Sequence, residues 1–292
     1  MVGTAEMGQL LGGGEMAYRI NVRKLIITLL MFAFGITFLL PFAWMISASL
    51  KPEADVFDYP VRWIPEKWQA AKNYKDVWMG QFPFYRYYWN SIKVTLITTF
   101  TSVLVSCLAA YAFAKIRFAG RNAAFLIVLA TYMIPTQAIL VPQFIFYREL
   151  GLFDTHIGLV LLNSFSVLGT FLLRQFFMGV NNEFIEAARI DGAGHWKIFA
   201  RIGLPLVKPA IATYAILRFI WTWNDYQNPL IFLKSPDLFT LPLGIRKFAD
   251  AHGEFYSLMM AASVSAIVPL LIAFVIGQKH VIEGISLGGV KG

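Results

Sequence analysis

A short stretch of this chain combines indole rings with side-chain amides and a carboxylate inside an otherwise apolar region. The members have the spacing i, i+3, i+4 and i+7, which predicts that they share one helical face: Trp221, Asn224, Asp225 and Asn228. Indole rings stack on sugar rings, and amides and carboxylates exchange hydrogen bonds with hydroxyl groups. The stretch is a candidate sugar-binding surface. Two structural alternatives stay open, namely an interfacial aromatic belt and a purely structural pair of Arg218 with Asp225.

A second polar group lies beside a proline in an earlier apolar run. Thr136 and Gln137 follow Pro135, and a proline inside an apolar run predicts a break whose freed backbone groups need a polar neighbourhood. Gln137 is therefore a further candidate for a solute path.

A third group lies in the polar segment 181–208, between two apolar runs. It reads Glu186-Ala187-Ala188, three residues, Gly192, then nine residues and Ile202-Gly203-Leu204-Pro205, with Asp191 preceding the glycine. Asn181 or Asn182 can cap a first helix, and its alanines let another surface approach the backbone closely. Gly192 and Gly194 allow a sharp turn into a second helix around 195–203, which Pro205 is expected to end. The segment predicts an L-shaped element that a partner can push, whereas the alternative is a merely solvated loop.

Other chemistry is not supported by the sequence. The four histidines, His156, His195, His252 and His280, have no partners at metal-ligand spacing, so we expect no metal. No catalytic triad or carboxylate pair lies inside an apolar run, and the phosphate-binding pattern G-x-x-x-x-G-K-[ST] is absent. We expect neither an enzyme nor a cofactor bound by this chain.

The composition is that of a membrane protein. Hydrophobic residues make up 58% of the 292 residues, charged residues only 14%, and the mean hydropathy is +0.60. A typical soluble protein has about 25% charged residues. The net charge of +8 consists of sparse cations between apolar runs, which indicates membrane orientation rather than nucleic-acid binding.

Six apolar segments are long enough to cross a bilayer, which takes about 20 residues. They are residues 25–48, 92–114, 123–146, 157–178, 209–233 and 257–278. The fold class is thus an all-α integral membrane protein with six transmembrane helices, spanning residues 19–292 behind a disordered tail at 1–18. Prolines at 135, 142 and 229 predict breaks in spans three and five, and both spans are expected at the bundle interior.

The short loops suggest the orientation. Lys115, Arg117 and Arg121 flank one turn, whereas Arg148 stands alone in the next, so the positive-inside rule places both termini in the cytoplasm. Ser47-Ala48-Ser49 resembles a signal-cleavage site, but the preceding apolar run is about twice the usual length, which favours an uncleaved first span.

The segment 181–208 resembles the EAA loop of binding-protein-dependent ABC importer permeases, with all seven fixed positions matching. The likeness extends from about residue 20 to the end, and is closest to oligosaccharide permeases of the smaller maltose-permease type. Further matching stretches are Asn90-Ser91, Ala110-Tyr111-Ala112-Phe113-Ala114, Arg117-Phe118-x-Gly120, Met133-Ile134-Pro135-Thr136-Gln137, Gly151-Leu152-x-Asp154-Thr155, Trp223-Asn224-Asp225 and Gly288-Gly289-Val290-Lys291-Gly292.

The resemblance implies a transport complex in a bacterial inner membrane. This chain would pair with a second, non-identical permease on two ATP-binding subunits, where the ATP and magnesium bind, and an extracytoplasmic solute-binding protein would deliver a sugar. Seven residues would couple it to the ATPase: Glu186, Ala187, Ala188, Asp191, Gly192, Leu204 and Pro205. Residues 234–256 would approach the binding protein, while most sugar contacts in maltose-type systems come from the other permease.

Two other classes remain as alternatives. A single-chain, ion-coupled carrier would need several acids within its spans, whereas Asp225 is the only one in the predicted spans. A membrane scaffold or channel subunit would leave the segment 181–208 without a purpose.

Overall fold

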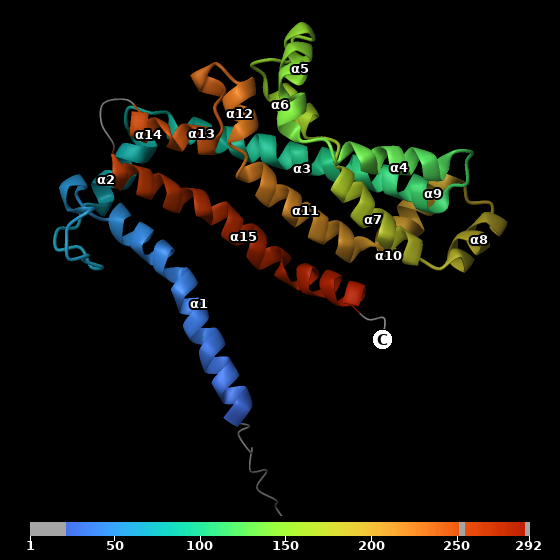
Figure 1. The fold of residues 1–292 in the computed structure, drawn as a ribbon, viewed down its shortest axis with the longest axis horizontal. Helices are drawn as coiled ribbons and strands as arrows, with labels where there is room; N and C mark the ends of the chain where they lie inside the picture. The colour runs from blue at the N-terminus through green and yellow to red at the C-terminus, as the bar shows by residue number, and fades with distance from the viewer. Residues whose placement is uncertain (1–21, 251–254, 290–292) are drawn as a thin grey trace, which may run out of the picture. The chain divides into compact units, whose positions relative to one another are not determined.

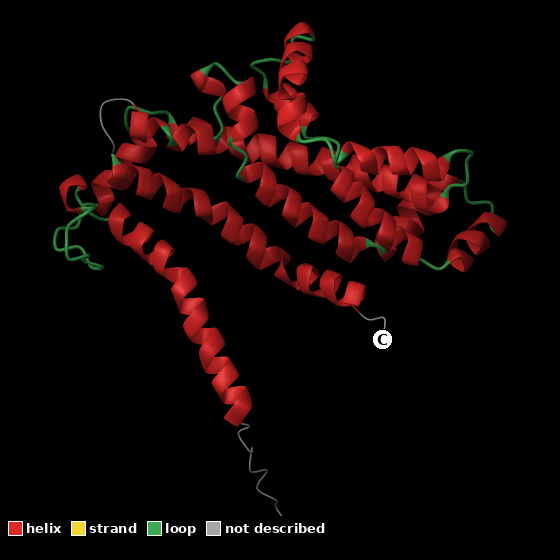
Figure 2. Cartoon of the chain, in the orientation of Figure 1, coloured by secondary structure: helices red, strands yellow, loops and turns green. Residues whose placement is uncertain are grey.

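The structure is a computed structural model that describes residues 22–250 and 255–289. The predicted disordered tail at 1–18 lies outside this range. The chain divides into two units, 1–44 and 45–292, which are described separately. Helices and connecting loops make up the described residues, and no strand occurs among them (Figure 2).

In the first unit, residues 22–44 form most of helix α1 (Val22–Ser49). Pro41 lies inside this helix without ending it. The apolar side chains of this part are exposed, as expected for a helix whose surroundings are lipid; Leu30, Met31 and Phe32 are all more than 60% exposed.

In the second unit, four helices form the centre of the described part. Helix α3 (Phe84–Lys115) packs against α7 (Val167–Gly179) and against α11 (Lys208–Trp223), and α11 in turn packs against α15 (Tyr256–Gly289) (Figure 1). Helix α2 (Ala70–Met79) covers the start of α15. The contact between α7 and α11 is very close, because the ring of Tyr214 lies where a side chain on Gly169 would have to go.

The predicted six spans agree with the helices. Three single helices are long and apolar enough to cross a membrane, namely Arg23–Ser49, Phe84–Lys115 and Tyr256–Lys279. Three bent helix pairs make up the remainder, so the described part of the chain has six spans if each pair counts as one. The pairs are Arg121–Thr131 with Thr136–Glu149, His156–Leu162 with Val167–Gly179, and His195–Leu206 with Lys208–Trp223.

The third span is broken at the position that Pro135 predicts. Helix α4 (Arg121–Thr131) ends there and α5 (Thr136–Glu149) leaves at 96°. A proline lacks the N–H group and its ring collides with the carbonyl four residues earlier, here that of Thr131. Pro142, in contrast, lies inside α5 without ending it. The span was expected at the bundle interior, and within this chain only its first half packs there: Phe125 of α4 is buried, whereas α5 buries no residue.

The fifth span differs from the single helix predicted at 209–233. Helix α11 ends at Trp223, and α12 (Gln227–Phe232) follows a short break. Pro229 accounts for the break, because a continuous helix would bring its ring against the carbonyl of Asp225. Pro229 itself lies in the first turn of α12, where a proline is tolerated.

The fourth span has a break although its sequence contains no proline. Helix α6 (His156–Leu162) and α7 meet at 49°. Ser166 caps α7 by accepting the Gly169 N–H at 3.0 Å, and the guanidinium of Arg218 donates to the carbonyl of Asn163 at 2.5 Å. The break therefore has its own hydrogen-bond partners, which satisfy groups that lipid cannot.

Two carboxylates fasten the loops at the α13 end of this unit, where α13 spans Leu241–Ile245. Glu53 accepts the N–H groups of Tyr256 and Ser257, each at 2.8 Å, at the start of α15. Asp154, whose φ of +58° is unusual outside glycine, accepts the N–H groups of Lys234 and Ser235 at 2.8 and 2.9 Å. Both interactions join loops that are far apart in the sequence.

Replacing Asp154 by Asn should make the loop contact insensitive to acid. Burial tends to raise the pKa of Asp154, but hydrogen bonds from Ser235 and Lys234 and the Lys234 charge outweigh this and lower it. A lowered folded-state pKa means that the carboxylate stabilises the fold fully above the unfolded value of about 4, and that this stabilisation is lost as the pH falls through the folded value. The stability difference between wild type and Asp154→Asn in thermal unfolding should be constant from pH 7 to about 4 and shrink below that. A difference that grows towards acid would contradict this role.

Candidate functional site

The segment 181–208 forms the two-armed element that its sequence predicts. Its first arm is α8 (Asn182–Ile190), which Asn181 caps by accepting the Glu183 N–H at 3.0 Å. Glu183 lies in the first turn and Arg189 in the last, where each complements the helix dipole.

The turn after α8 depends on a glycine. Gly192 has φ of +75°, and its N–H donates to the carbonyl of Arg189 at 3.0 Å while that of Ala193 donates to the carbonyl of Ala188 at 2.9 Å. These two bonds are the Schellman arrangement, which satisfies the last helix carbonyls and reverses the chain. No atom lies within 4 Å of the place where a Gly192 side chain would begin, so the glycine is required by backbone conformation and not by space.

The second arm is longer than predicted. Helix α9 (His195–Ile198) continues through a π-helical turn, η2 (Phe199–Gly203), into α10 (Leu204–Leu206). The predicted end at Pro205 is wrong: the bend of 78° into α11 follows Leu206. Since a proline has no N–H for the carbonyl of Arg201 and its ring would crowd it, the wider π turn lets the arm continue past Pro205.

Buried side chains tie both arms to the helical bundle. Ile185 of α8 and Ile198 and Phe199 of the second arm are buried in one core with Tyr111 of α3 and Phe177 of α7. The ring centroids of Tyr111 and Phe199 are 5.1 Å apart. In addition, the Lys115 ammonium donates to the carbonyl of Val180 at 2.6 Å and to the Asn182 side chain at 2.7 Å. A force applied to either arm therefore reaches three spans directly.

The opposite side of α8 is exposed and partly apolar. Glu186 and Ala187 are exposed and Ala188 is half-buried. Large apolar side chains stand beside them without cover: Phe184 is 57% exposed, Ile190 87% and Trp196 of α9 68%. Asp191, Gly192 and Pro205 are exposed, whereas Leu204 packs against the core. An apolar surface of this kind on a polar segment is suited to contact with another protein.

The candidate solute residues do not share the helical face that their spacing predicts. Trp221 lies on α11 and Asn224 caps its end, but Asp225 lies in the break and Asn228 on α12. Asp225 accepts the Asn228 N–H at 3.1 Å and its side-chain amide at 2.7 Å. Asp225 thus stabilises the start of α12. No salt bridge within 4 Å joins Arg218 to Asp225 among the described residues, although the two charges attract each other, and their structural pairing stays a prediction.

Asp225→Ala should destabilise the break more than Asp225→Asn does. Alanine leaves the start of α12 without an acceptor, which costs about 0.5–2 kcal/mol at a helix cap, whereas asparagine keeps one. Thermal unfolding of the purified chain would measure this order. If Asp225→Asn leaves stability unchanged but weakens sugar uptake, the carboxylate also contacts solute. Equal stability of all three proteins would contradict the capping role.

Two further positions of the candidate path remain accessible. Asn224 is exposed and lines a cavity of about 230 Å³ together with Trp223, Ser263 and Leu241. Trp223 itself is buried and donates its indole N–H to the carbonyl of Ala266 at 3.0 Å. Trp221 is 44% exposed. Gln137 lies in the first turn of α5, where its recorded partner is Thr136, and no hydrogen bond joins it to the other four described residues.

The sequence reasoning missed a polar face on α3. Its members are spaced by three or four residues and are buried against α7 and α11: Thr95, Thr98, Ser102 and Ser106. Ser102 and Tyr214 share a hydrogen bond of 2.9 Å. The signal was present in the sequence, since small polar residues at helical spacing within a span indicate an interhelical contact. Within the described residues, no cluster of His, Cys, Asp or Glu is arranged to hold a metal ion.

Comparison with known proteins gives consistent results. The model of the family described as "binding-protein-dependent transport system inner membrane component" matches residues 102–286. The arabinooligosaccharides permease AraQ of Bacillus subtilis is 32% identical over 93% of this chain and 97% of its own, and the galactooligosaccharides permease GanQ of the same organism 30% identical over 95% and 99%. A chain of a bacterial ABC transporter for the import of alginate matches in structure, with TM-score 0.80 and 26% identity over 88% of this chain and 96% of that one.

Proposed function

This chain belongs to the family of binding-protein-dependent transport system inner membrane components, and from that premise we propose that it is one permease subunit of an ATP-driven sugar importer in a bacterial cell membrane. The observation that carries the proposal is the segment 181–208. It presents an exposed apolar and small-residue surface on α8, while buried side chains connect it to α3, α7 and α11. Such an element converts the movement of a docked partner into movement of the spans.

The proposed complex follows from this division of labour. Two ATP-binding subunits hold ATP and magnesium, and one of them receives α8 through Glu186, Ala187, Ala188, Asp191 and Gly192. Leu204 and Pro205 belong to the second arm, which leads into span five. A second, non-identical permease completes the pathway. The α8 end and both termini are then cytoplasmic, and the α13 end faces the solute-binding protein.

The substrate class that we propose is oligosaccharide. AraQ and GanQ are named for arabinooligosaccharide and galactooligosaccharide transport, and the structural relative imports the polysaccharide alginate. Trp221, Asn224, Asp225, Asn228 and Gln137 are the proposed contributors of this chain to the path. Asn224 is the best placed of these, because it is exposed beside a cavity at the end of span five.

Reconstituted uptake tests the proposal. Vesicles that contain the purified complex and its binding protein should accumulate labelled arabino- or galactooligosaccharide when ATP is enclosed with the ATPase subunits. An ionophore should leave this uptake unchanged. Uptake that persists without ATP and disappears with the ionophore would establish the rival function, an ion-coupled carrier.

Ala187→Trp should separate transport from folding. Ala187 is exposed on α8, so an indole there adds bulk to the docking surface without entering the core. We expect uptake to fall by about tenfold or more, since a loss of about 1.4 kcal/mol of docking free energy corresponds to a factor of ten. Ala130→Trp, at an exposed position of α4, is the matched control. Equal uptake by both variants would argue against docking at α8.

A further inference from the structure

A basic cavity of about 460 Å³ lies between the turn that joins α3 to α4 and the helix α8. Four permanent cations line it, Lys115, Arg117, Arg121 and Arg189, together with His195 and a single carboxylate, Glu186. The formal excess is therefore three positive charges. A concave surface with charges of one sign raises the local concentration of counter-ions.

The charges of this cavity are not neutralised from within. Lys115 donates to Val180 and Asn182, and Arg121 makes a weak contact of 3.4 Å with the carbonyl of Ile116. Within the described part of the chain, the side chains of Arg117 and Arg189 make no hydrogen bond or ion pair, and Glu186 forms no salt bridge within 4 Å. Two guanidinium groups thus face the cavity without an anionic partner.

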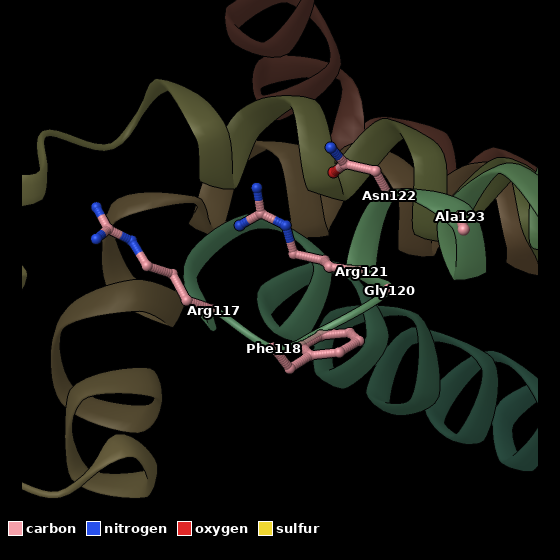
Figure 3. Close-up of a pocket in the computed structure, with 6 residues that line it drawn as sticks. All are labelled: Arg117, Phe118, Gly120, Arg121, Asn122 and Ala123. Carbon is pink, nitrogen blue, oxygen red and sulfur yellow. The ribbon is translucent and has the colours of Figure 1, made fainter.

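A second cavity, of about 360 Å³, adjoins the first and shares Arg117 and Arg121 with it. Figure 3 shows both guanidinium groups and the Asn122 amide extending to the same side of the turn, whereas the Phe118 ring does not. Each planar guanidinium group is suited to a phosphate, because it presents several N–H donors in one plane.

Apolar side chains are exposed in the second cavity and along the helix that follows it. Phe118, which lines that cavity, is 44% exposed, and on α4 Leu126 and Ile127 are 64% and 67% exposed. Leu126 and Ile127 belong to the third span, which begins at Arg121, so the cations lie at the level where its apolar surface ends. An occupant that is anionic at one end and apolar along its length matches this arrangement. An acidic protein segment would leave the exposed apolar side chains without a contact.

We propose that Arg117 and Arg121 bind the headgroup phosphate of an anionic phospholipid in the membrane leaflet at the α8 end. The acyl chains then lie along the exposed apolar surface of the third span. The proposal does not depend on coupling to an ATPase, because neither arginine lies in the segment 181–208. Lipid binding would nevertheless affect that coupling, since Glu186 and Arg189 of α8 line the same cavity as Arg117 and Arg121. A bound headgroup therefore contacts the arm that the ATPase is proposed to move.

Lipid binding by the full-length chain, purified with the subunits that accompany it and freed of native lipid, tests this directly. Phosphatidylglycerol and phosphatidylcholine with identical acyl chains are titrated separately, and inorganic phosphate is added as a competitor. Phosphatidylglycerol binding should weaken about fivefold in Arg117→Gln and about 30-fold in Arg117→Gln/Arg121→Gln, since each cation near a membrane surface contributes about 1 kcal/mol. Phosphatidylcholine binding should be the same in all proteins.

Arg148→Gln, which removes one exposed cation at the far end of α5, is the matched control and should bind phosphatidylglycerol like wild type. The proposal is overturned if the double variant retains full phosphatidylglycerol affinity, or if millimolar phosphate displaces the lipid, which would identify a site for free phosphate. It is equally overturned if the double variant keeps its lipid but loses the ATPase subunits, because the cavity then serves a protein partner. The Arg117 side chain has no hydrogen-bond or ion-pair partner among the residues that the structure describes, so the single variant is expected to fold even if the double variant does not.

Discussion

Gly192→Val is expected to lower ATP-driven uptake about tenfold or more while the chain still inserts into the membrane. Gly192 has φ of +75°, a conformation that costs an L-residue about 1–2 kcal/mol and a β-branched one the most. The valine either strains the turn or abolishes the two hydrogen bonds that fix the angle between α8 and the second arm. A misdirected α8 cannot present the surface that we propose for docking. Uptake and ATP hydrolysis by the reconstituted complex measure the effect.

Two matched variants identify the cause. Gly192→Asn supplies a side chain that tolerates this backbone conformation, and Gly194→Ala changes a glycine whose φ is −71° and whose surroundings are open. If backbone conformation is decisive, both variants transport like wild type. If Gly192→Asn fails together with Gly192→Val, the partner requires an empty space at this position. Normal uptake by Gly192→Val would remove the coupling role from this turn.

Gly169→Ala should strongly destabilise the contact between α7 and α11. A Cβ atom at this position would lie 2.2 Å from Cζ of Tyr214, far inside contact distance. The tyrosine cannot retreat, because it is 1% exposed and its hydroxyl shares a hydrogen bond with Ser102 on α3. Overpacking of this kind costs about 1–3 kcal/mol. Thermal unfolding of the purified chain should show the loss.

Gly179→Ala is the control, since no atom lies within 4 Å of a side chain at the other end of α7. Tyr214→Leu in the Gly169→Ala background should restore part of the stability by removing the ring. Equal unfolding temperatures for Gly169→Ala and Gly179→Ala would mean that α7 and α11 separate easily, which would contradict the close contact of these helices.

The sequence predicted the number and type of the spans because bilayer crossing leaves a strong signal. A span is recognised from a run of about 20 apolar residues, and this local composition can be read without knowing which neighbours the helix packs against. The L-shaped element was predictable for a similar reason. Asn181, Gly192 and the alanines of α8 act through local backbone geometry, which the residue types determine by themselves.

The positions of the breaks were harder to predict. A proline indicates that a helix is disturbed, but its neighbours determine where. Helix α5 continues through Pro142, a π turn accommodates Pro205, and α11 ends several residues before Pro229. The break in span four has no proline and depends on Arg218, which reaches Asn163 from another span. Such tertiary partners are not visible in a pattern of residues, and the same limit explains why the predicted face with Trp221 and Asp225 was wrong.

The contact of Glu53 with the first turn of α15 restrains the movement of that end of the helix. A helix of 34 residues is roughly 50 Å long, and this one is pinned at its beginning by a carboxylate from more than 200 positions earlier. A helix that is held at its first turn moves mostly at its last turn. Excursions of the last span should therefore be smallest at the α13 end of this unit and largest at the opposite end, so the α13 end stays nearly fixed while the other end moves.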